Sequence, residues 1–261
     1  IVFKNNITGE NMKLLLYNVC YCMGVGKGYK DYISCNKSIV LDSKALNRIA
    51  NFIKKQSPQI VGLVEIDTGS IRSQRVDQAE YIRNKLKFNS VASFCKYGNS
   101  KLSKLPYFKH LANSILAKNK FTKVNEYYFK YGRKKLVLEV EIDNKYAIYL
   151  VHLSLTKGFR SKQIKELAGI VLNNSKPKIV IGDFNTFDGD KELNKFMMTT
   201  GMVLAKHNLN TFPAWKPKKC LDHVLYSKNI KINKLFAPIV KYSDHLPIIV
   251  DFSVNRKYNS K

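Results

Sequence analysis

Eight polar residues stand at or near the ends of apolar runs, where a side chain can leave the protein core and meet a ligand. They are Asn18, Glu65, His152, Asp183, Asn185, Asp222, Asp244 and His245. One such residue would mean little, because Gly, Asp and Asn also form ordinary turns. Eight of them suggest that several strand ends converge on one cleft, the place where many α/β folds bind their ligands.

The residue types suit one kind of chemistry. Carboxylate and amide oxygens are hard ligands that favour Mg²⁺ or Mn²⁺, and histidines beside carboxylates suit acid–base catalysis near neutral pH. Hydrolysis of a phosphate ester needs a cation on the phosphoryl oxygens, an activated water and a stabilised leaving group. Glu65 follows the apolar run Ile60–Val64, and a carboxylate there is costly unless it meets a cation or hydrogen-bond donors. Glu65 is therefore a candidate metal ligand.

Two other hydrolase classes are not supported by the sequence. The His-Glu-x-x-His pattern of zinc proteases is absent, and so is the Gly-x-Ser-x-Gly pattern of serine hydrolases. A phosphate-binding P-loop is not matched by the glycine-rich segment Gly24 to Gly28 either, because such a loop needs Gly-Lys-Ser/Thr at the start of a helix.

Apolar runs and helical stripes predict the elements that must position these residues. Strands are expected over Lys13–Tyr21, Ile60–Val64, Val91–Phe94, Ser114–Ala117, Leu136–Ile142, Tyr146–Val151, Lys178–Ile181, Leu221–Tyr226 and Ile248–Phe252. Helices are expected over Asp42–Gln56, Arg72–Leu86, Ser161–Asn173 and Glu192–Met198. Strands that alternate with helices, together with a hairpin about Asp143 and Asn144, indicate an α/β protein with mixed sheets.

One domain is expected, because apolar runs extend along the chain and no linker rich in Pro, Gly or Ser divides it. We place it at residues 12–254, with a peripheral segment at 1–11 and a polar tail at 255–261. No stretch approaches the roughly 18 apolar residues of a membrane-spanning helix. No obligate protein partner is evident from the sequence.

The five cysteines are odd in number and show no spacing typical of a disulfide framework or a zinc site. Cys20 and Cys22 are expected on one face of the first strand, as buried thiols. This usage favours a reducing, cytoplasmic compartment. Secretion stays open, because the sequence begins at Ile1 and an upstream signal could have been removed.

The chain is strongly basic, with a net charge of +26 and a pI near 9.8. Such a balance favours polyanionic partners, namely nucleic acid, an anionic membrane or a phosphorylated substrate. Only 7 of the 45 basic residues are Arg, and lysine-rich chains also arise from AT-biased genomes. Since Arg is the preferred residue for bidentate base recognition, scattered lysines predict phosphate attraction with weak sequence preference.

The motifs, taken in order, resemble the endonuclease/exonuclease/phosphatase superfamily with the DNase I-like fold. The matching segments are Tyr17-Asn18-Val19, Val64-Glu65, His152-Leu153, Gly182-Asp183-Phe184-Asn185, Leu221-Asp222-His223 and Ser243-Asp244-His245-Leu246-Pro247. The resemblance extends from about Met12 to Phe252. It implies a four-layer α/β sandwich, in which helices flank two packed mixed β-sheets and the active site lies at one end.

The resemblance also implies a metal site. Glu65 would be the main ligand of Mg²⁺, with Mn²⁺ as the alternative ion. Asn18 and Asp244 would lie close to the metal or to its bound waters.

Catalytic roles follow from the same resemblance. His245 would be the general base for the attacking water and would be oriented by Asp222, while Asp183 would help to position that water. His152 would also assist the leaving group. The substrate contacts implied are Asn113, His152 and Asn185.

The chain differs at two positions from one branch of this superfamily. Its abasic-site nucleases carry a second acid where this chain has Val19-Cys20, and a Tyr where it has His152. The sequence therefore resembles more closely the DNase I and sphingomyelinase-like branches.

We expect an Mg²⁺-dependent phosphodiester hydrolase, a nuclease of low sequence specificity. The first alternative is a sphingomyelin or phospholipid phosphodiesterase or a phosphoinositide phosphatase, with Phe212 and Trp215 inserted into an anionic membrane. The second alternative is a non-catalytic binding protein on the same fold, but such a protein would normally have lost a metal or base residue, and none is lost here.

Overall fold

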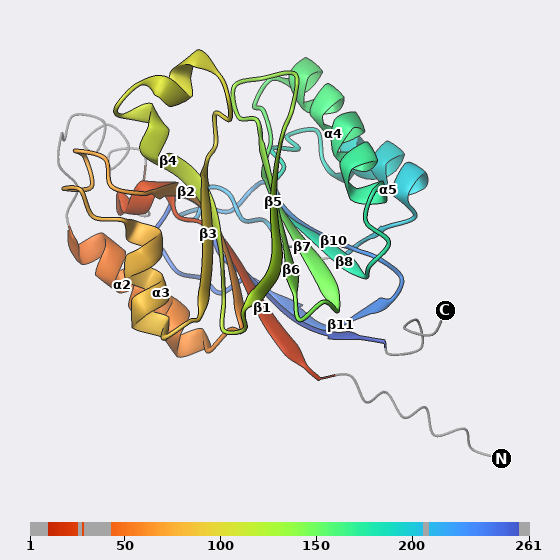
Figure 1. The fold of residues 1–261 in the computed structure, drawn as a ribbon, viewed down its shortest axis with the longest axis horizontal. Helices are drawn as coiled ribbons and strands as arrows, with labels where there is room; N and C mark the ends of the chain where they lie inside the picture. Colours follow the sequence, from red (N-terminus) through yellow and green to blue (C-terminus); the bar gives the residue numbers. More distant parts are fainter. Residues whose placement is uncertain (1–9, 26–27, 29–42, 206–208, 256–261) are drawn as a thin grey trace.

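Two six-stranded sheets pack face to face in the computed structural model, which describes residues 10–25, 28, 43–205 and 209–255 (Figure 1). The first sheet has the order β11 (Ile230–Phe236), β12 (Ile248–Val254), β1 (Met12–Asn18), β2 (Ile60–Asp67), β4 (Leu111–Ala117) and β3 (Ser90–Cys95). The second has the order β5 (Phe121–Tyr128), β6 (Leu136–Ile142), β7 (Tyr146–His152), β8 (Lys178–Asp183), β10 (Asp222–Tyr226) and β9 (Val203–Leu204). Both sheets are mixed, because β1–β2 and β7–β8 are parallel pairs among antiparallel neighbours.

Helices cover the outer face of each sheet, so that the protein has four layers. Helices α2 (Ser43–Gln56) and α3 (Gln78–Leu86) lie on the first sheet, and α4 (Lys157–Leu172) and α5 (Asn194–Thr200) lie on the second (Figure 1). Each helix pair packs an apolar stripe against outward-facing strand residues, as Ile49 does against Val61. The four-layer α/β sandwich expected from the sequence is confirmed.

The central core lies between the two sheets and follows the period of two along each strand. Leu14 and Leu16 of β1 share this buried layer with Ile179 and Ile181 of β8 in the facing sheet. The sheets approach most tightly at Gly62 in β2, where an added Cβ would lie 2.6 Å from Cδ1 of Ile181. A glycine is needed here because the opposing side chain already fills the space.

The first strand is shorter than predicted. It ends at Asn18, and Cys20–Cys22 form a 3₁₀ turn in which all three residues have positive φ. The backbone N–H of Cys20 donates to Oδ1 of Asn18 at 3.2 Å, which stabilises the turn. Cys20 and Cys22 are buried as expected, but they do not lie on a strand face.

Two helices begin at other residues than predicted. Helix α3 begins at Gln78 because the side chain of Asp77 accepts from the backbone N–H of Glu80, which caps the helix. Helix α4 begins at Lys157, four residues before the predicted start at Ser161. The predicted helix Glu192–Met198 is divided into a 3₁₀ turn, η4 (Asp190–Leu193), and α5.

Strands β5 and β11 were not predicted. Both lie toward the edges of their sheets and carry mostly exposed or partly exposed residues, so that their sequences lack an apolar run. Among the described residues no helix is long and apolar enough to cross a membrane. The peripheral segment and polar tail expected at the termini lie mostly outside the described residues.

Candidate active site

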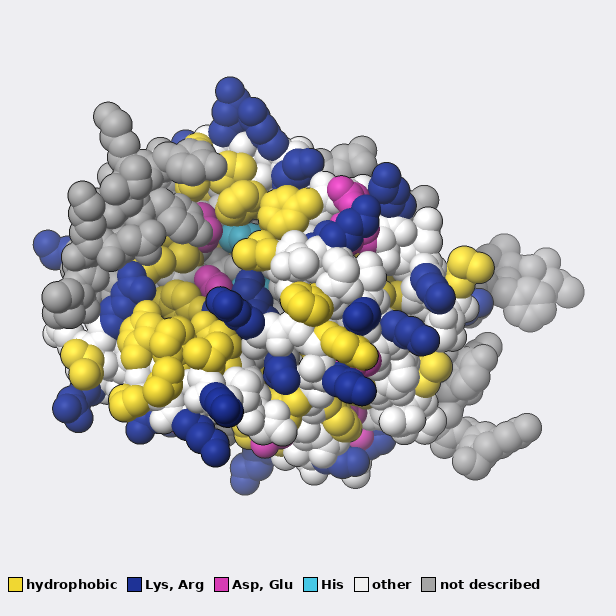
Figure 2. All heavy atoms as spheres, turned by 90° about the horizontal axis from the view of Figure 1, so that it is seen from above, with side chains coloured by type: hydrophobic (Ala, Val, Ile, Leu, Met, Phe, Trp, Pro, Cys, Tyr) yellow, Lys and Arg dark blue, Asp and Glu magenta, His cyan; other side chains and the backbone are white. Residues whose placement is uncertain are grey.

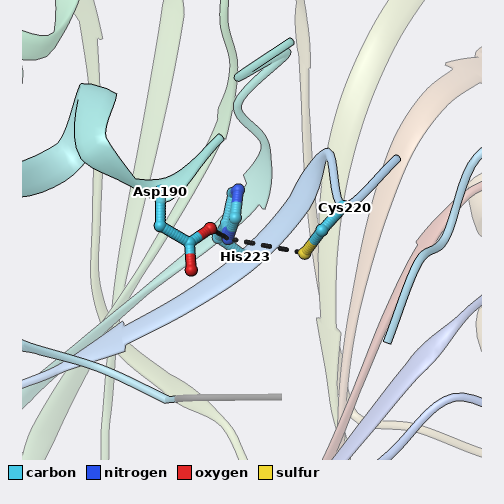
Figure 3. A group of neighbouring side chains, drawn as sticks. All are labelled: Asp190, Cys220 and His223. Atoms are coloured by element: carbon cyan, nitrogen blue, oxygen red, sulfur yellow. Dashed lines mark hydrogen bonds and ion pairs between the residues drawn. The ribbon is translucent and has the colours of Figure 1, made fainter. Parts of the chain in front are cut away.

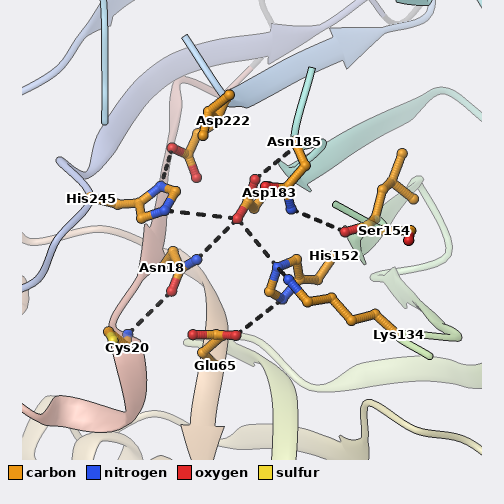
Figure 4. A network of polar contacts seen from close by, with 12 residues as sticks. Asn18, Cys20, Glu65, Lys134, His152, Ser154, Asp183, Asn185, Asp222 and His245 are labelled. Carbon is orange, nitrogen blue, oxygen red and sulfur yellow. Dashed lines mark hydrogen bonds and ion pairs between the residues drawn. The ribbon is translucent and has the colours of Figure 1, made fainter. Parts of the chain in front are cut away.

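Strand register brings three of the predicted site residues side by side. In the parallel pair β7–β8, His152 is aligned with Asp183, and in the antiparallel pair β8–β10, Asp222 is aligned with the same Asp183. Asn18 ends β1 in the facing sheet, and its Nδ2 donates to Oδ2 of Asp183 at 3.1 Å. The site therefore bridges the two sheets at one end of the sandwich (Figure 4).

Asp183 lies at the centre of this network. Its Oδ2 is 3.3 Å from Nε2 of His152 and 3.8 Å from Nε2 of His245, and its Oδ1 accepts from the backbone N–H of Asn185 at 3.0 Å. Burial opposes ionisation of the carboxyl group, but the charges of His152, His245 and Lys134 outweigh it and hold the pKa of Asp183 below its usual range. Asp183 is therefore ionised at neutral pH.

His245 and Asp222 form a buried pair. Nδ1 of His245 lies 2.7 Å from Oδ2 of Asp222, and both side chains are at most 5% exposed. Burial lowers the pKa of His245, but Asp222, Asp183 and Asp244 outweigh burial and raise it to about 10. The pairing that the sequence predicted for these two residues is present in the structure.

Glu65 is presented by an irregularity in β2. The register of β2 against β4 shifts between Leu63 and Ile66, and Glu65 itself has φ of 56°. Its backbone N–H donates to Oδ1 of Asn113 at 3.1 Å. Asn113, predicted to contact substrate, thus helps to shape the backbone at Glu65; among the described residues, its buried Nδ2 has no hydrogen-bond partner.

Two lysines complete the site, and sequence reasoning missed both. Nζ of Lys96 lies 3.0 Å from Oε1 of Glu65 and also contacts the hydroxyl of Tyr21, while Nζ of Lys134 contacts Nε2 of His152. Burial raises the pKa of Glu65, but Lys96, His152 and Lys134 outweigh it, so that the pKa stays well below normal. Lys96 directly follows β3, the same kind of position that marked the other site residues. It was not recognised because lysine is abundant along the whole chain.

The predicted metal ligands fit a hard divalent cation in donor type. Glu65 supplies an ionised carboxylate whose side chain is 17% exposed, and Asn18 lies at the facing strand end. Asp244 joins them through Ser243, whose Oγ lies 2.7 Å from the carbonyl of Asn18 and 3.1 Å from Oδ1 of Asp244. Oxygen donors of this kind suit Mg²⁺ or Mn²⁺, although Lys96 already contacts one oxygen of Glu65.

The remaining predicted residues differ in their surroundings. Nδ2 of Asn185 donates to the carbonyl of Leu153 at 3.0 Å, which anchors the turn after β8 to the end of β7. Asp67, two residues after Glu65, is buried and accepts from the backbone N–H groups of Gly69 and Ser70. It therefore orders the loop after β2 and serves the site only through that loop.

The site lies at the bottom of a hollow. Seen from above, acidic and histidine side chains form its floor, and hydrophobic and basic side chains surround it (Figure 2). On the side of His152, a pocket of about 610 Å³ is lined by Arg133, Lys134, Leu155 and Phe159 among others. A substrate can therefore reach the acid–histidine network from solvent.

A sandwich with this acid–histidine network defines a class of phosphoester hydrolases. The sequence pattern of the Endonuclease/Exonuclease/phosphatase family matches residues 15–245, and the chain belongs to that family. None of the curated proteins compared matches it in sequence. The family acts on phosphoester bonds and generally uses divalent metal ions, so that the chain is an enzyme of this type.

Solved structures share the fold at low identity. An endonuclease/exonuclease/phosphatase from Beutenbergia cavernae is 16% identical with a TM-score of 0.69, and the match covers 94% of this chain and 72% of that one. A TDP2 of D. rerio, humanized by 14 mutations, is 14% identical with a TM-score of 0.68, covering 94% and 99%. A mannosyl-6-phosphatase from Bacteroides thetaiotaomicron is 11% identical with a TM-score of 0.65, covering 92% and 99%.

Proposed function

We propose that the protein is an Mg²⁺-dependent phosphodiesterase that cleaves nucleic acid with little sequence preference. The observation that carries this proposal is the contact network of Asp183 with Asn18, His152 and His245 across the two sheets. It supplies a fixed ionised carboxylate, two imidazoles and two lysines around one position, the set that in-line displacement at phosphorus requires. When bound beside Glu65 and Asp244, the divalent cation would supply charge neutralisation at the phosphoryl oxygens.

The attacking water would be held between His245 and Asp183. The 3.8 Å between Nε2 of His245 and Oδ2 of Asp183 is too long for a direct hydrogen bond and leaves both atoms within reach of one oxygen. Protonated His245 cannot accept a proton, so its role as base needs a lower pKa than the metal-free chain gives it. A cation bound beside Asp244 would lower the pKa of His245, because Asp244 is one of the groups that raise this pKa.

The leaving group would be stabilised on the opposite side. Burial and the neighbouring Lys134 lower the pKa of His152 to about 4, so that the imidazole is neutral at pH 7 and has one N–H to donate. Lys134 adds positive charge at the same position. Charge that develops on the leaving oxygen would therefore meet a hydrogen-bond donor and a cation that are already in place.

Nucleic acid is favoured as the substrate by charge. With a net charge of +26, the chain attracts phosphate backbones at long range. Base readout needs planar, bidentate donors, and the scarcity of Arg provides few of them. Cleavage at many sequences is the expected outcome.

The direct test is a metal-dependence assay with matched variants. Chain treated with a chelator and then supplied with Mg²⁺ should degrade duplex DNA, single-stranded DNA or RNA, and Glu65→Gln should reduce turnover by roughly 10² to 10³. Glu80→Gln, in the partly exposed ion pair of Glu80 with Arg83, is the control and should keep full activity. Turnover that does not depend on Mg²⁺, or that survives in Glu65→Gln, would contradict the proposal.

A lipid phosphodiesterase is the second candidate, and one observation favours it. Exposed hydrophobic residues stand on loops, and on the first turn of α4, at the site end of the sandwich: Ile71 after β2, Leu105 and Tyr107 before β4, Leu155 after β7, and Phe159 in α4. Side chains of this kind border the hollow in Figure 2. Hydrolysis of sphingomyelin or a phosphoinositide in vesicles, with no cleavage of nucleic acid, would favour the lipid phosphodiesterase over the nuclease.

A further inference from the structure

Outside the candidate active site, the described residues bring three different metal-binding side chains together. Asp190 begins the 3₁₀ turn η4, and Cys220 and His223 lie just before and within β10 (Figure 3). Nδ1 of His223 is 3.9 Å from Oδ1 of Asp190 and 3.9 Å from Sγ of Cys220, and the three donor atoms all lie within 4.8 Å of one another. His223 is buried, Cys220 is half-buried and Asp190 is exposed, so that an ion can reach the group from solvent.

The hydrogen bonds of Thr186 determine which nitrogen of His223 faces this group. The hydroxyl of Thr186 lies 3.4 Å from the carbonyl of Cys220 and 2.7 Å from Nε2 of His223. Thr186 thus engages Nε2, and Nδ1 is the ring nitrogen that points at the thiol of Cys220 and the carboxylate of Asp190.

The three side chains offer one oxygen, one sulfur and one nitrogen to the same small region. A cation at its centre would lie within reach of all three ligand atoms at once. A histidine whose other nitrogen is fixed by a hydrogen bond is also the usual state of a metal-binding histidine.

We propose that Asp190, Cys220 and His223 bind a zinc ion, with a solvent molecule as the fourth ligand. A cation at the centre of the three donors would lie roughly 2.5 Å from each, slightly beyond the bond lengths of about 2.0–2.3 Å that zinc makes with nitrogen, oxygen and sulfur. Movement of the exposed Asp190 side chain by a few tenths of an ångström closes this difference. Mixed N, O and S donors select zinc over Mg²⁺, which prefers oxygen alone.

This zinc site is distinct from the catalytic cation. Successive residues of a strand point to opposite faces of the sheet, so that His223 points away from the side where Asp222 meets His245. Thr186 nevertheless follows directly on Asn185, and Glu192 in the same turn as Asp190 is held by Arg160 through a bidentate ion pair. Zinc would tie this turn to β10 and so brace the backbone that carries Asp183 and Asp222.

Cobalt substitution gives a test with a readout other than activity. Metal-free full-length chain is titrated with Co²⁺, and the near-ultraviolet charge-transfer band of a cobalt–thiolate bond is measured. We expect the band to saturate at one ion per chain, to be removed by Zn²⁺, and to be absent in Cys220→Ser. Asp190→Asn, at an exposed position, should fold normally and weaken binding by about tenfold or more.

Two controls separate this site from other thiols and from the catalytic metal. Cys95→Ser changes another half-buried thiol, and Glu65→Gln changes the candidate catalytic ligand; both should keep the band. A band that persists in Cys220→Ser, or that is lost in Cys95→Ser, would overturn the proposal. So would failure of folded wild-type chain to bind Co²⁺ or Zn²⁺ at micromolar concentration. Loss of the band in Glu65→Gln would instead place the thiolate-bound ion at the active site.

Discussion

At the level of single residues, the site depends on which groups are kept charged in a buried network. Asp183 and Glu65 are ionised because cationic neighbours outweigh the cost of burial. The residue types at strand ends were enough to predict Asn18, Asp183 and Asp222 as neighbours, because register aligns Asp183 with Asp222 and the packing of the two sheets brings Asn18 to them. Lys96 also follows a strand but was hidden by the abundance of lysine, whereas Lys134 stands before β6 and so was not marked by a strand end.

Asp222 and His245 should behave as one catalytic unit. Because the 2.7 Å contact orients the imidazole, Asp222→Asn should already remove most of the activity that His245→Ala removes. Steady-state rates of the two single variants and the double variant test this. If the two losses multiply in full in the double variant, the residues act independently.

The same pair should make stability depend on pH in the alkaline range. The pKa of His245 is raised to about 10 in the fold from an ordinary value near 6.5, so the folded state binds the proton more tightly. The stabilisation is thus complete below about pH 6.5 and is lost as the pH rises towards 10. Urea unfolding of metal-free wild type should show this loss, and His245→Gln should show a smaller one; equal losses would mean that another group is responsible.

At the level of elements, the sequence predicted the central strands well and the edges poorly. The hairpin of Leu136–Ile142 and Tyr146–His152 was evident because both strands are buried throughout. Edge strands β5 and β11 carry polar side chains on the faces that meet solvent, so no apolar run marks them. The 3₁₀ turn at Cys20–Cys22 depends on the hydrogen bond accepted by Asn18, which strand propensity does not reveal.

Packing between the two sheets should be sensitive at Gly62. A Cβ there would lie 2.6 Å from Cδ1 of Ile181 and 3.3 Å from Cδ1 of Leu150, so Gly62→Ala should destabilise the protein by about 1–3 kcal/mol. Because both contacts are the ends of flexible side chains, Ile181→Val should be less costly in the Gly62→Ala background than in wild type. The free energies of unfolding of the four proteins in urea give this comparison, and additive effects would show that the two positions do not touch.

At the level of the whole molecule, charge and shape act together. Two sheets present their strand ends to one hollow, and a basic surface surrounds it (Figure 2). The fold class was predictable from the order of elements and motifs, whereas the choice between nucleic acid and lipid depends on loops whose shape the sequence did not reveal.

Binding to duplex DNA should weaken steeply with salt if nucleic acid is the substrate. Each neutralised phosphate releases counterions, and a chain that contacts 6–10 phosphates loses about 10³ to 10⁵ in affinity between 50 and 200 mM salt. Fluorescence anisotropy with catalytically inactive Glu65→Gln measures this slope. A flat slope, or no binding at low salt, would favour the lipid substrates.

The contact between Lys96 and Glu65 has a consequence for how the enzyme matures. An ammonium group 3.0 Å from the carboxylate serves as an internal counter-ion, so this end of the sandwich needs no external cation to offset its buried negative charge while the chain folds. Folding would then precede loading of the proposed Mg²⁺, which would enter by sharing or displacing a charge that is already present. Uptake of that cation would be an exchange between a tethered ion and a free one.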